Sequence, residues 1–92
     1  MTPEFIMYYR KNRLDTNRLG ITVSKKIGHA VERNRAKRVI REAYRLCEDR
    51  IKNGYDFVFV ARSRTTKIPM TAVKTRMEDI FGEEKIFAES EL

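Results

Sequence analysis

The residues with the clearest chemical potential form a dense cluster of positive charge between Lys25 and Arg41. This stretch reads KKIGHAVERNRAKRVIR and holds seven lysines and arginines against a single acid, Glu32. Its net charge of six nearly accounts for the +7 of the whole 92-residue chain. Cations packed this densely repel one another and gain most by facing a polyanion. The chemistry that these residues favour is therefore the binding of phosphate groups.

The same stretch has the periodicity of an amphipathic helix. At about 100° per residue, a helix over 31–51 collects its apolar side chains on one side and its cations on the other. Arg33, Lys37 and Arg41 recur every four residues and form one ridge. Like charges at this spacing cost an isolated helix roughly 0.2–0.5 kcal/mol per pair, a cost that a polyanion would offset. The polar side also holds Asn34, Arg38 and Arg45, and the apolar side holds Ala36, Val39, Ile40, Ala43, Tyr44, Leu46, Cys47 and Ile51.

The charge pattern of this helix leaves two alternatives open. It would also suit a solvated cationic face, or a basic helix that binds a membrane surface or calmodulin. The small and medium apolar residues, two alanines among them, favour packing on a sheet. No run approaches the roughly 18 apolar residues of a membrane span, and no secretion signal is present, so we expect a cytoplasmic protein without a membrane partner.

Three strands are expected around the basic helix. The first covers 4–10, and the second covers 18–25 and runs antiparallel to it. In the second strand, alternation places Gly20, Thr22 and Ser24 on one face, which would be either a shallow floor beside Tyr8 of the neighbouring first strand or a sparsely covered solvent face. The run YDFVFVA at 55–61 is apolar on both faces, which indicates a central strand. Second strand, basic helix and third strand together predict a βαβ crossover.

The C-terminal part predicts one more helix and a tail. Pro69 suits the first turn of a helix over 69–81, and Gly82 suits its C-terminal cap. A chain of 92 residues has room for one core, so 1–82 is expected to be a single domain. The acidic stretch 83–92 is expected to be a frayed tail.

Side chains that could perform catalysis are sparse. His29 is the only histidine, which excludes a multi-histidine metal cluster and a convincing serine triad. The single Cys47 excludes an intramolecular disulfide, and we expect it to be buried and inert. Glu42 is expected to form an ion pair, and Asp56, at the start of a strand, to accept a turn hydrogen bond. The chain therefore shows no convincing active site of its own.

The segment AVERNRAKRVIRE, at 30–42, resembles the signature helix of the bacterial ribonuclease P protein component, with Arg33, Asn34 and Arg35 as its Arg-Asn-Arg core. RLGITVSKKIG before it and YDFVFVAR after it are similar to the flanking strands of that family. The resemblance extends over about 5–81. It implies an α+β fold, a small α/β sandwich of the ribosomal protein S5 domain 2-like class, with a mixed sheet and two main helices. It also implies a left-handed βαβ crossover, against the general right-handed rule.

The family resemblance implies an accessory subunit of an endoribonuclease. Such a subunit binds the catalytic ribonuclease P RNA and the single-stranded 5′ leader of precursor tRNA, and the RNA removes the leader. Mg²⁺ would be the cofactor, held mainly by the RNA. A ribosomal-type structural RNA-binding protein is the alternative. The RNA-binding residues implied are Tyr8, in the leader cleft, and Lys25, Lys26, Arg33, Asn34, Arg35, Lys37, Arg38, Arg41 and Arg45.

The start of the chain departs from the family pattern. Family members begin with a helix that forms the other wall of the leader cleft, whereas strand residues begin here by Phe5. We therefore expect an N-terminally truncated form, with impaired leader binding and partly retained docking on the catalytic RNA. An exposed cleft face would also permit a homodimer.

Overall fold

A three-stranded mixed β-sheet is the central element of the structure, a computed structural model that describes residues 4–87. Its strand order is β1-β3-β2. The first strand, β1 (Phe5–Lys11), pairs antiparallel with β3 (Tyr55–Ala61), and β2 (Arg18–Val23) pairs parallel with β3 on its other side. Residues 1–3 and 88–92 lie outside the description, so the expected N-terminal truncation stays a prediction.

The position of β3 confirms one prediction and corrects another. The run that is apolar on both faces is the central strand, as predicted. The prediction that β1 and β2 are neighbours is wrong, because β3 lies between them, although they do run in opposite directions. The loop 12–17 therefore spans two strand spacings, about 10 Å, instead of making a tight hairpin.

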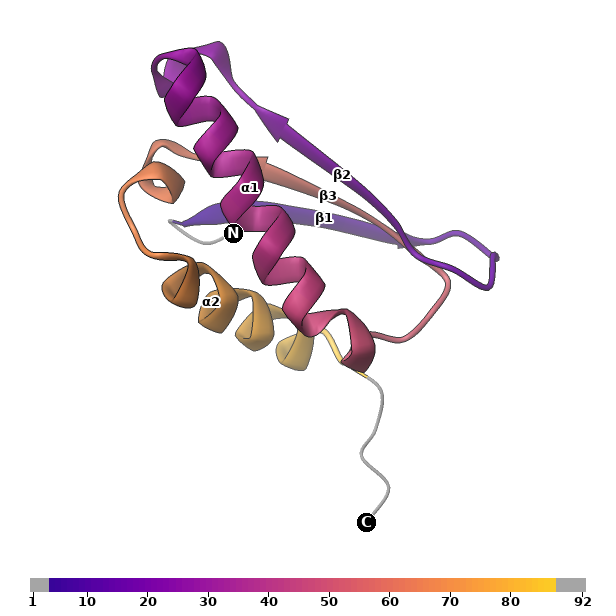
Figure 1. Ribbon diagram of the computed structural model, residues 1–92. Coiled ribbons are helices and arrows are strands. Elements are labelled where there is room, and N and C mark those ends of the chain that lie inside the picture. Colours follow the sequence, from indigo (N-terminus) through magenta and orange to yellow (C-terminus); the bar gives the residue numbers. More distant parts are fainter. Residues whose placement is uncertain (1–3, 88–92) are drawn as a thin grey trace.

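The helix α1 (Ala30–Cys47) connects β2 to β3 in a left-handed crossover. In Figure 1, α1 lies in front of the sheet, β2 and β3 both run from right to left, and β3 lies below β2. If this view is turned so that both strands point upward, with α1 still toward the viewer, β3 lies to the left of β2. This is the hand that the family resemblance implied, and the opposite of the general rule.

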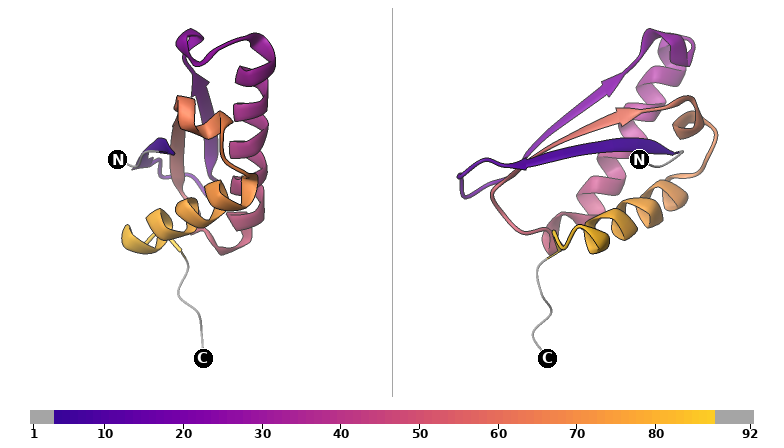
Figure 2. Two further views of the ribbon diagram at one scale, coloured as in Figure 1. Left: turned by 90° about the vertical axis from the view of Figure 1, so that its left-hand side faces the viewer. Right: turned by 180° about the vertical axis from the view of Figure 1, so that it is seen from behind.

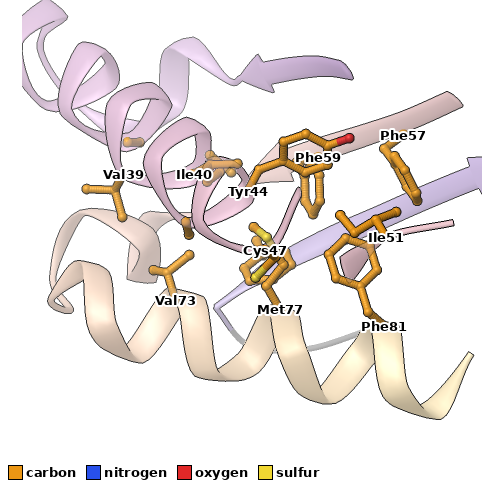
Figure 3. Close-up of a cluster of buried hydrophobic side chains, with 14 of the residues drawn as sticks. Val39, Ile40, Tyr44, Cys47, Ile51, Phe57, Phe59, Val73, Met77 and Phe81 are labelled. Carbon is orange, nitrogen blue, oxygen red and sulfur yellow. The ribbon is translucent and has the colours of Figure 1, made fainter. Parts of the chain in front are cut away.

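The core lies between α1, the helix α2 (Met70–Glu83) and one face of the sheet. Phe57 and Phe59 of β3 are almost completely buried on that face, and the ring centroid of Phe57 lies 5.4 Å from that of Phe81 in α2. Figure 3 shows these rings beneath Tyr44 of α1. Each fully buried ring contributes roughly 1.5–3 kcal/mol by leaving water. Burial of Phe57 and Phe59 therefore holds α1 to the sheet.

The apolar side of α1 is buried as predicted, with one exception. Leu46 is 42% exposed, because the sheet and α2 cover only the sector of the helix around Ala36 and Ala43. The helix is also shorter than predicted, since α1 ends at Cys47 and a 3-10 turn, η2 (Glu48–Arg50), follows it. The predicted apolar residues found buried are Ala36, Val39, Ile40, Ala43, Tyr44, Cys47 and Ile51.

The chain after α2 corrects the prediction of a frayed tail. Gly82 lies inside the last turn, and the helix stops before Lys85, whose φ of 58° breaks the helical path. Ile86 is 1% exposed and its carbonyl accepts a 2.9 Å hydrogen bond from the Lys52 amide. Phe87 forms a β-bridge with Ile51. The expectation of a loose tail is therefore wrong for 83–87, because its apolar residues complete the core.

The face of the sheet away from α1 carries no helix in the part of the chain that the structure describes. Figure 2 shows α1 on one side of the sheet, α2 crossing beneath it, and the opposite face bare in the view from behind. The side chains on this open face come from alternate positions of the strands, beginning with Ile6, Arg18 and Asp56. The fold thus presents two separate surfaces, the outer side of α1 and the open face of the sheet.

A substitution of Ile86 tests whether 84–87 belongs to the core. Ile86→Ala should lower the free energy of unfolding by about 2–5 kcal/mol, because it leaves a cavity at a buried position. Urea denaturation followed by circular dichroism measures the change. The exposed neighbour Glu83 supplies the control, since Glu83→Ala should leave the midpoint nearly unchanged. Equal urea midpoints for the two variants would support the original expectation of a frayed tail.

Candidate nucleic-acid interface

The outer side of α1 presents a group of cations without acidic partners. Arg35, Lys37, Arg38 and Arg41 are all exposed. None of the four takes part in an ion pair within the described residues. Because α1 is pinned to the sheet by its apolar side, these four side chains have to face solvent or a partner. Their uncompensated charge suits a phosphate backbone.

Two arginines predicted to bind RNA are engaged within the chain instead. Arg33 is half-buried, and its Nη1 donates a 2.6 Å hydrogen bond to the Gly28 carbonyl. Arg45 pairs with Glu42, its Nε lying 3.1 Å from Oε2, and this contact lowers the pKa of the Glu42 carboxyl. The predicted ion pair of Glu42 is thereby confirmed. Neither arginine has the freedom of the four unpaired cations.

The connector before α1 has a backbone built for a sharp turn. Ser24 Oγ accepts a 3.1 Å hydrogen bond from the Lys26 amide and caps the 3-10 turn η1 (Lys25–Ile27). Gly28 then takes φ 129°, and a Cβ there would lie 2.0 Å from the Glu32 carboxylate. A glycine is therefore required at this position. Lys26 is exposed beside the turn, and the side chain of Lys25 lies outside the description.

Tyr8 lies on a different surface from the basic helix. The register aligns Tyr8 with Val58 and Val58 with Gly20, so the three form one row across the open face. Tyr8 is 59% exposed and Val58 38% exposed. The prediction that Tyr8 stands beside a floor of Gly20, Thr22 and Ser24 is wrong, because Val58 of β3 separates Tyr8 from Gly20. The structure therefore gathers the exposed cations of α1 on one surface and places Tyr8 on the opposite face of the sheet.

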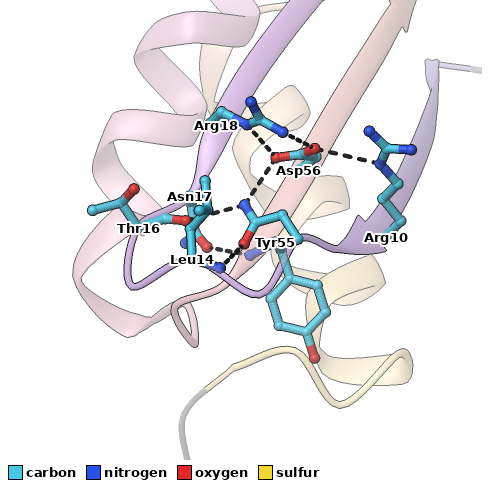
Figure 4. A network of polar contacts seen from close by, with 8 residues as sticks. Arg10, Leu14, Thr16, Asn17, Arg18, Tyr55 and Asp56 are labelled. Atoms are coloured by element: carbon cyan, nitrogen blue, oxygen red, sulfur yellow. Dashed lines mark hydrogen bonds and ion pairs between the residues drawn. The ribbon is translucent and has the colours of Figure 1, made fainter.

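A polar row crosses the open face beside the row that contains Tyr8. Asp56, in the middle strand, faces Arg10 of β1 and Arg18 of β2 in the register. Arg18 binds both carboxylate oxygens, with Nε and Nη2 each 2.7 Å from an oxygen, and Arg10 Nε lies 3.4 Å from Oδ2 (Figure 4). Asn12 donates a further 2.8 Å hydrogen bond to Oδ1. These contacts, with that of Arg18 the strongest, hold the pKa of the Asp56 carboxyl well below its usual range.

The role of Asp56 was not predicted correctly. It is not a turn acceptor but the centre of an ion network that joins all three strands. Two features of the sequence carried the signal: YDFVFVA has a single acid in an otherwise apolar strand, and Arg10 and Arg18 stand at the facing ends of the two other strands. The pairing itself requires the strand order, because Asp56 reaches both arginines only from the centre of the sheet.

The open face is also hollowed. A cavity of about 230 Å³ lies over the sheet, lined by Tyr8, Tyr9, Arg10, Asp56 and Val58. Its lining combines an aromatic ring, an aliphatic side chain and a guanidinium. Aromatic rings and guanidinium planes are groups on which unpaired bases stack.

The described residues contain no group of three or more histidine, cysteine, aspartate or glutamate side chains placed to hold a metal ion. The Asp56 carboxylate is occupied by two arginines and an asparagine. These residues do not fit a resident Mg²⁺ site. No helix within residues 4–87 is both long and apolar enough to cross a membrane.

Taken together, the fold and the surfaces define a small basic α+β domain with an exposed cationic helix on a mixed sheet. The family model described as Ribonuclease P matches residues 1–85. A ribonuclease P protein component from Caldanaerobacter subterraneus subsp. tengcongensis is 41% identical over 86 residues, which cover 94% of this chain and 74% of that relative.

Solved structures give the same result. The ribonuclease P protein of Staphylococcus aureus superposes with a TM-score of 0.81 at 32% identity, covering 96% of this chain and 81% of that one. The ribonuclease P protein of Thermotoga maritima superposes with a TM-score of 0.80 at 29% identity, covering 98% of this chain and 82% of that one. The chain belongs to the ribonuclease P protein component family, and its role is that of a subunit of this endoribonuclease in tRNA processing. This confirms the predicted α+β fold and the predicted subunit function.

The Asp56 network predicts a pH-dependent contribution to stability. Because the folded protein lowers the pKa of Asp56, the stabilisation is complete above the range near pH 4 where an aspartate of the unfolded chain titrates, and it fades as the pH falls further. Asp56→Asn should therefore lower the urea midpoint clearly at pH 7 and by a smaller amount at pH 2.5. Asp15→Asn, at an exposed loop position, is the control. A difference that is the same at both pH values would contradict the assignment.

Proposed function

We propose that the outer side of α1 docks on the catalytic ribonuclease P RNA. The observation that carries this proposal is the group of four exposed cations, Arg35, Lys37, Arg38 and Arg41, without acidic partners among the described residues. A helix held at its apolar side gives them fixed spacing, so the phosphate contacts do not have to order a flexible segment. Lys26 and Asn34 extend this surface, and Lys25 is proposed as a further contact. Arg33 and Arg45 would contact the RNA through the N–H donors that their internal contacts leave free.

The open face of the sheet is proposed as the site for the single-stranded 5′ leader of precursor tRNA. Tyr8, 59% exposed, offers a ring for stacking, and the 230 Å³ hollow beside it has room for a base. Stacking of a base on an aromatic ring is worth roughly 1–3 kcal/mol and tolerates different sequences. The stacking contact by itself would therefore not select among leader sequences.

The chain is proposed to be an accessory subunit without catalytic residues of its own. Asp56, the acid at the centre of the open face, is neutralised by arginines, so the protein would supply binding and the RNA would hold the Mg²⁺ ions and perform the hydrolysis. We place this activity in the cytoplasm. A structural role on ribosomal RNA, the alternative from the sequence, is disfavoured by the family membership.

Pairing of two copies through the open face is a further part of this proposal. The face is bare in the described residues and carries exposed Tyr8 and Val58. Sedimentation velocity at high protein concentration measures the mass of the particle. A strict monomer under those conditions would remove the homodimer.

The subunit role is tested by cleavage at low Mg²⁺. The chain is mixed with a bacterial ribonuclease P RNA and a precursor tRNA at an Mg²⁺ concentration too low for the RNA alone. Release of the 5′ leader is expected, because the added cations strengthen substrate binding. Absence of both cleavage and RNA binding would contradict the proposal.

The docking surface is tested by the salt dependence of RNA binding. Replacing Lys37, Arg38 and Arg41 by alanine should weaken binding and reduce the slope of log affinity against log salt by about two, at about 0.7 per single-strand phosphate. The control replaces exposed lysines at 52, 67 and 85, which removes the same charge elsewhere. If both triple variants have the same slope of log affinity against log salt, the outer side of α1 faces solvent and the docking proposal is wrong.

A further inference from the structure

The ion network and the row that contains Tyr8 are adjacent on one surface. Asp56 and Val58 are two residues apart in β3, so the row through Asp56 lies about 7 Å from the row through Tyr8, Val58 and Gly20. Gly20 has no side chain, which leaves space between Arg18 and the next positions of β2. Arg10 lies beside Tyr8 in β1, whereas Arg18 lies beside Gly20 in β2, two strand spacings or about 10 Å across the face. A single-stranded RNA that stacks on Tyr8 and crosses toward Gly20 would therefore pass within reach of both arginines.

The charge of the open face differs from that of α1. Asp56 balances one of the two guanidinium charges in its row, whereas the four exposed cations of α1 have no acid to balance them. Attraction of phosphates depends on uncompensated charge and on the counterions that it releases. The open face should consequently bind with a weaker salt dependence than α1.

The geometry of Arg18 restricts what its guanidinium can contact. Asp56 takes the Nε–H and one N–H of Nη2, each at 2.7 Å. Of the five N–H donors of an arginine, three remain, and two of these lie together on the Nη1–Nη2 edge. A bidentate pair of this kind also fixes the plane of the guanidinium, which stays 60% exposed. The plane of this guanidinium can stack on a base. Its free N–H donors can hydrogen-bond to the edge of a base.

The carboxylate that holds Arg18 is itself held from other sides. Asn12 donates to Oδ1 at 2.8 Å and also to the Thr16 carbonyl at 3.2 Å, which ties the carboxylate to the loop between β1 and β2. Arg10 approaches Oδ2 at 3.4 Å and is 77% exposed, so it is the looser of the two arginines. The orientation of Arg18 therefore depends chiefly on Asp56.

We propose that Asp56 is a positioning residue for leader recognition: it fixes Arg18 at the Gly20 end of the row that begins at Tyr8, and it cancels part of the guanidinium charge, so that the open face reads bases more than phosphates. This inference rests on the proposed binding of the leader to the open face. It assigns the two surfaces different tasks. The outer side of α1 supplies salt-dependent affinity, and the open face supplies a preference among leader sequences.

The test uses the chain assembled with a bacterial ribonuclease P RNA, so that α1 is already occupied. Fluorescent single-stranded RNA decamers of A, C or U are titrated at several salt concentrations, and anisotropy gives the dissociation constants. The wild-type chain should separate the best from the worst decamer by about tenfold, the effect of one stacked and hydrogen-bonded base. Equal binding of the three decamers by the wild-type chain would overturn the inference.

Two substitutions separate the effect of the Arg18 orientation from the effect of the charge of the open face. Asp56→Asn should reduce the preference to about twofold and steepen the salt slope by about 0.7, because a freed arginine gains a phosphate. Arg18→Lys keeps the charge but loses the bidentate plane, so it should reduce the preference without changing the slope. Asp15→Asn adds the same charge as Asp56→Asn at an exposed loop position and should behave as wild type.

The outcomes distinguish this inference from the function on which it rests. If Tyr8→Ala leaves decamer binding unchanged, the open face is not the leader site and the proposed function fails. If Tyr8→Ala weakens binding but Asp56→Asn and Arg18→Lys keep both the wild-type preference and the wild-type slope, only the positioning role of Asp56 is wrong. If the Asp56→Asn variant does not fold, the Arg18→Lys variant still tests the positioning role of Asp56.

Discussion

The packing of α1 against the buried face of β3 is the constraint on which the other features depend. Phe57 and Phe59 leave water beneath α1, whose Tyr44 ring lies 5.9 and 6.1 Å from theirs, and beside Phe81 of α2. Once α1 is fixed in this way, its remaining side has to face outward, and this is the side that carries the cations. The same packing commits one face of the sheet to the core and leaves the other open.

This arrangement separates two kinds of electrostatic surface within a small domain. On the outer side of α1 the cations repel one another. Binding of a polyanion would offset this repulsion. On the open face Arg10 and Arg18 both contact Asp56, which balances one of their two charges. Association with RNA would thus be driven by one surface, while the other is free to respond to the shape and the edges of unpaired bases.

The C-terminal segment shows how a small core uses every apolar residue that the chain offers. Ile86 and Phe87 follow a stretch of acids, yet they close the end of the core, where the Arg50 guanidinium lies 4.6 Å from the centroid of the Phe87 ring. Composition suggested a solvated tail because 83–92 holds four acids against a single lysine. Burial instead follows the position of each side chain once Lys85 has turned the backbone.

The sequence by itself determined the elements, their faces and the chemistry of the basic helix, because periodicity and charge are local properties of the chain. It identified β3 as the central strand and the buried side of α1, and the motif at Arg33, Asn34 and Arg35 indicated the family. Tertiary structure decided what depends on distant partners. Only the strand order brings Asp56 between Arg10 and Arg18, and only the fold separates Tyr8 from the cations of α1 by the thickness of the sheet. Contacts between residues some forty positions apart have no periodic signature, so local patterns could not reveal them.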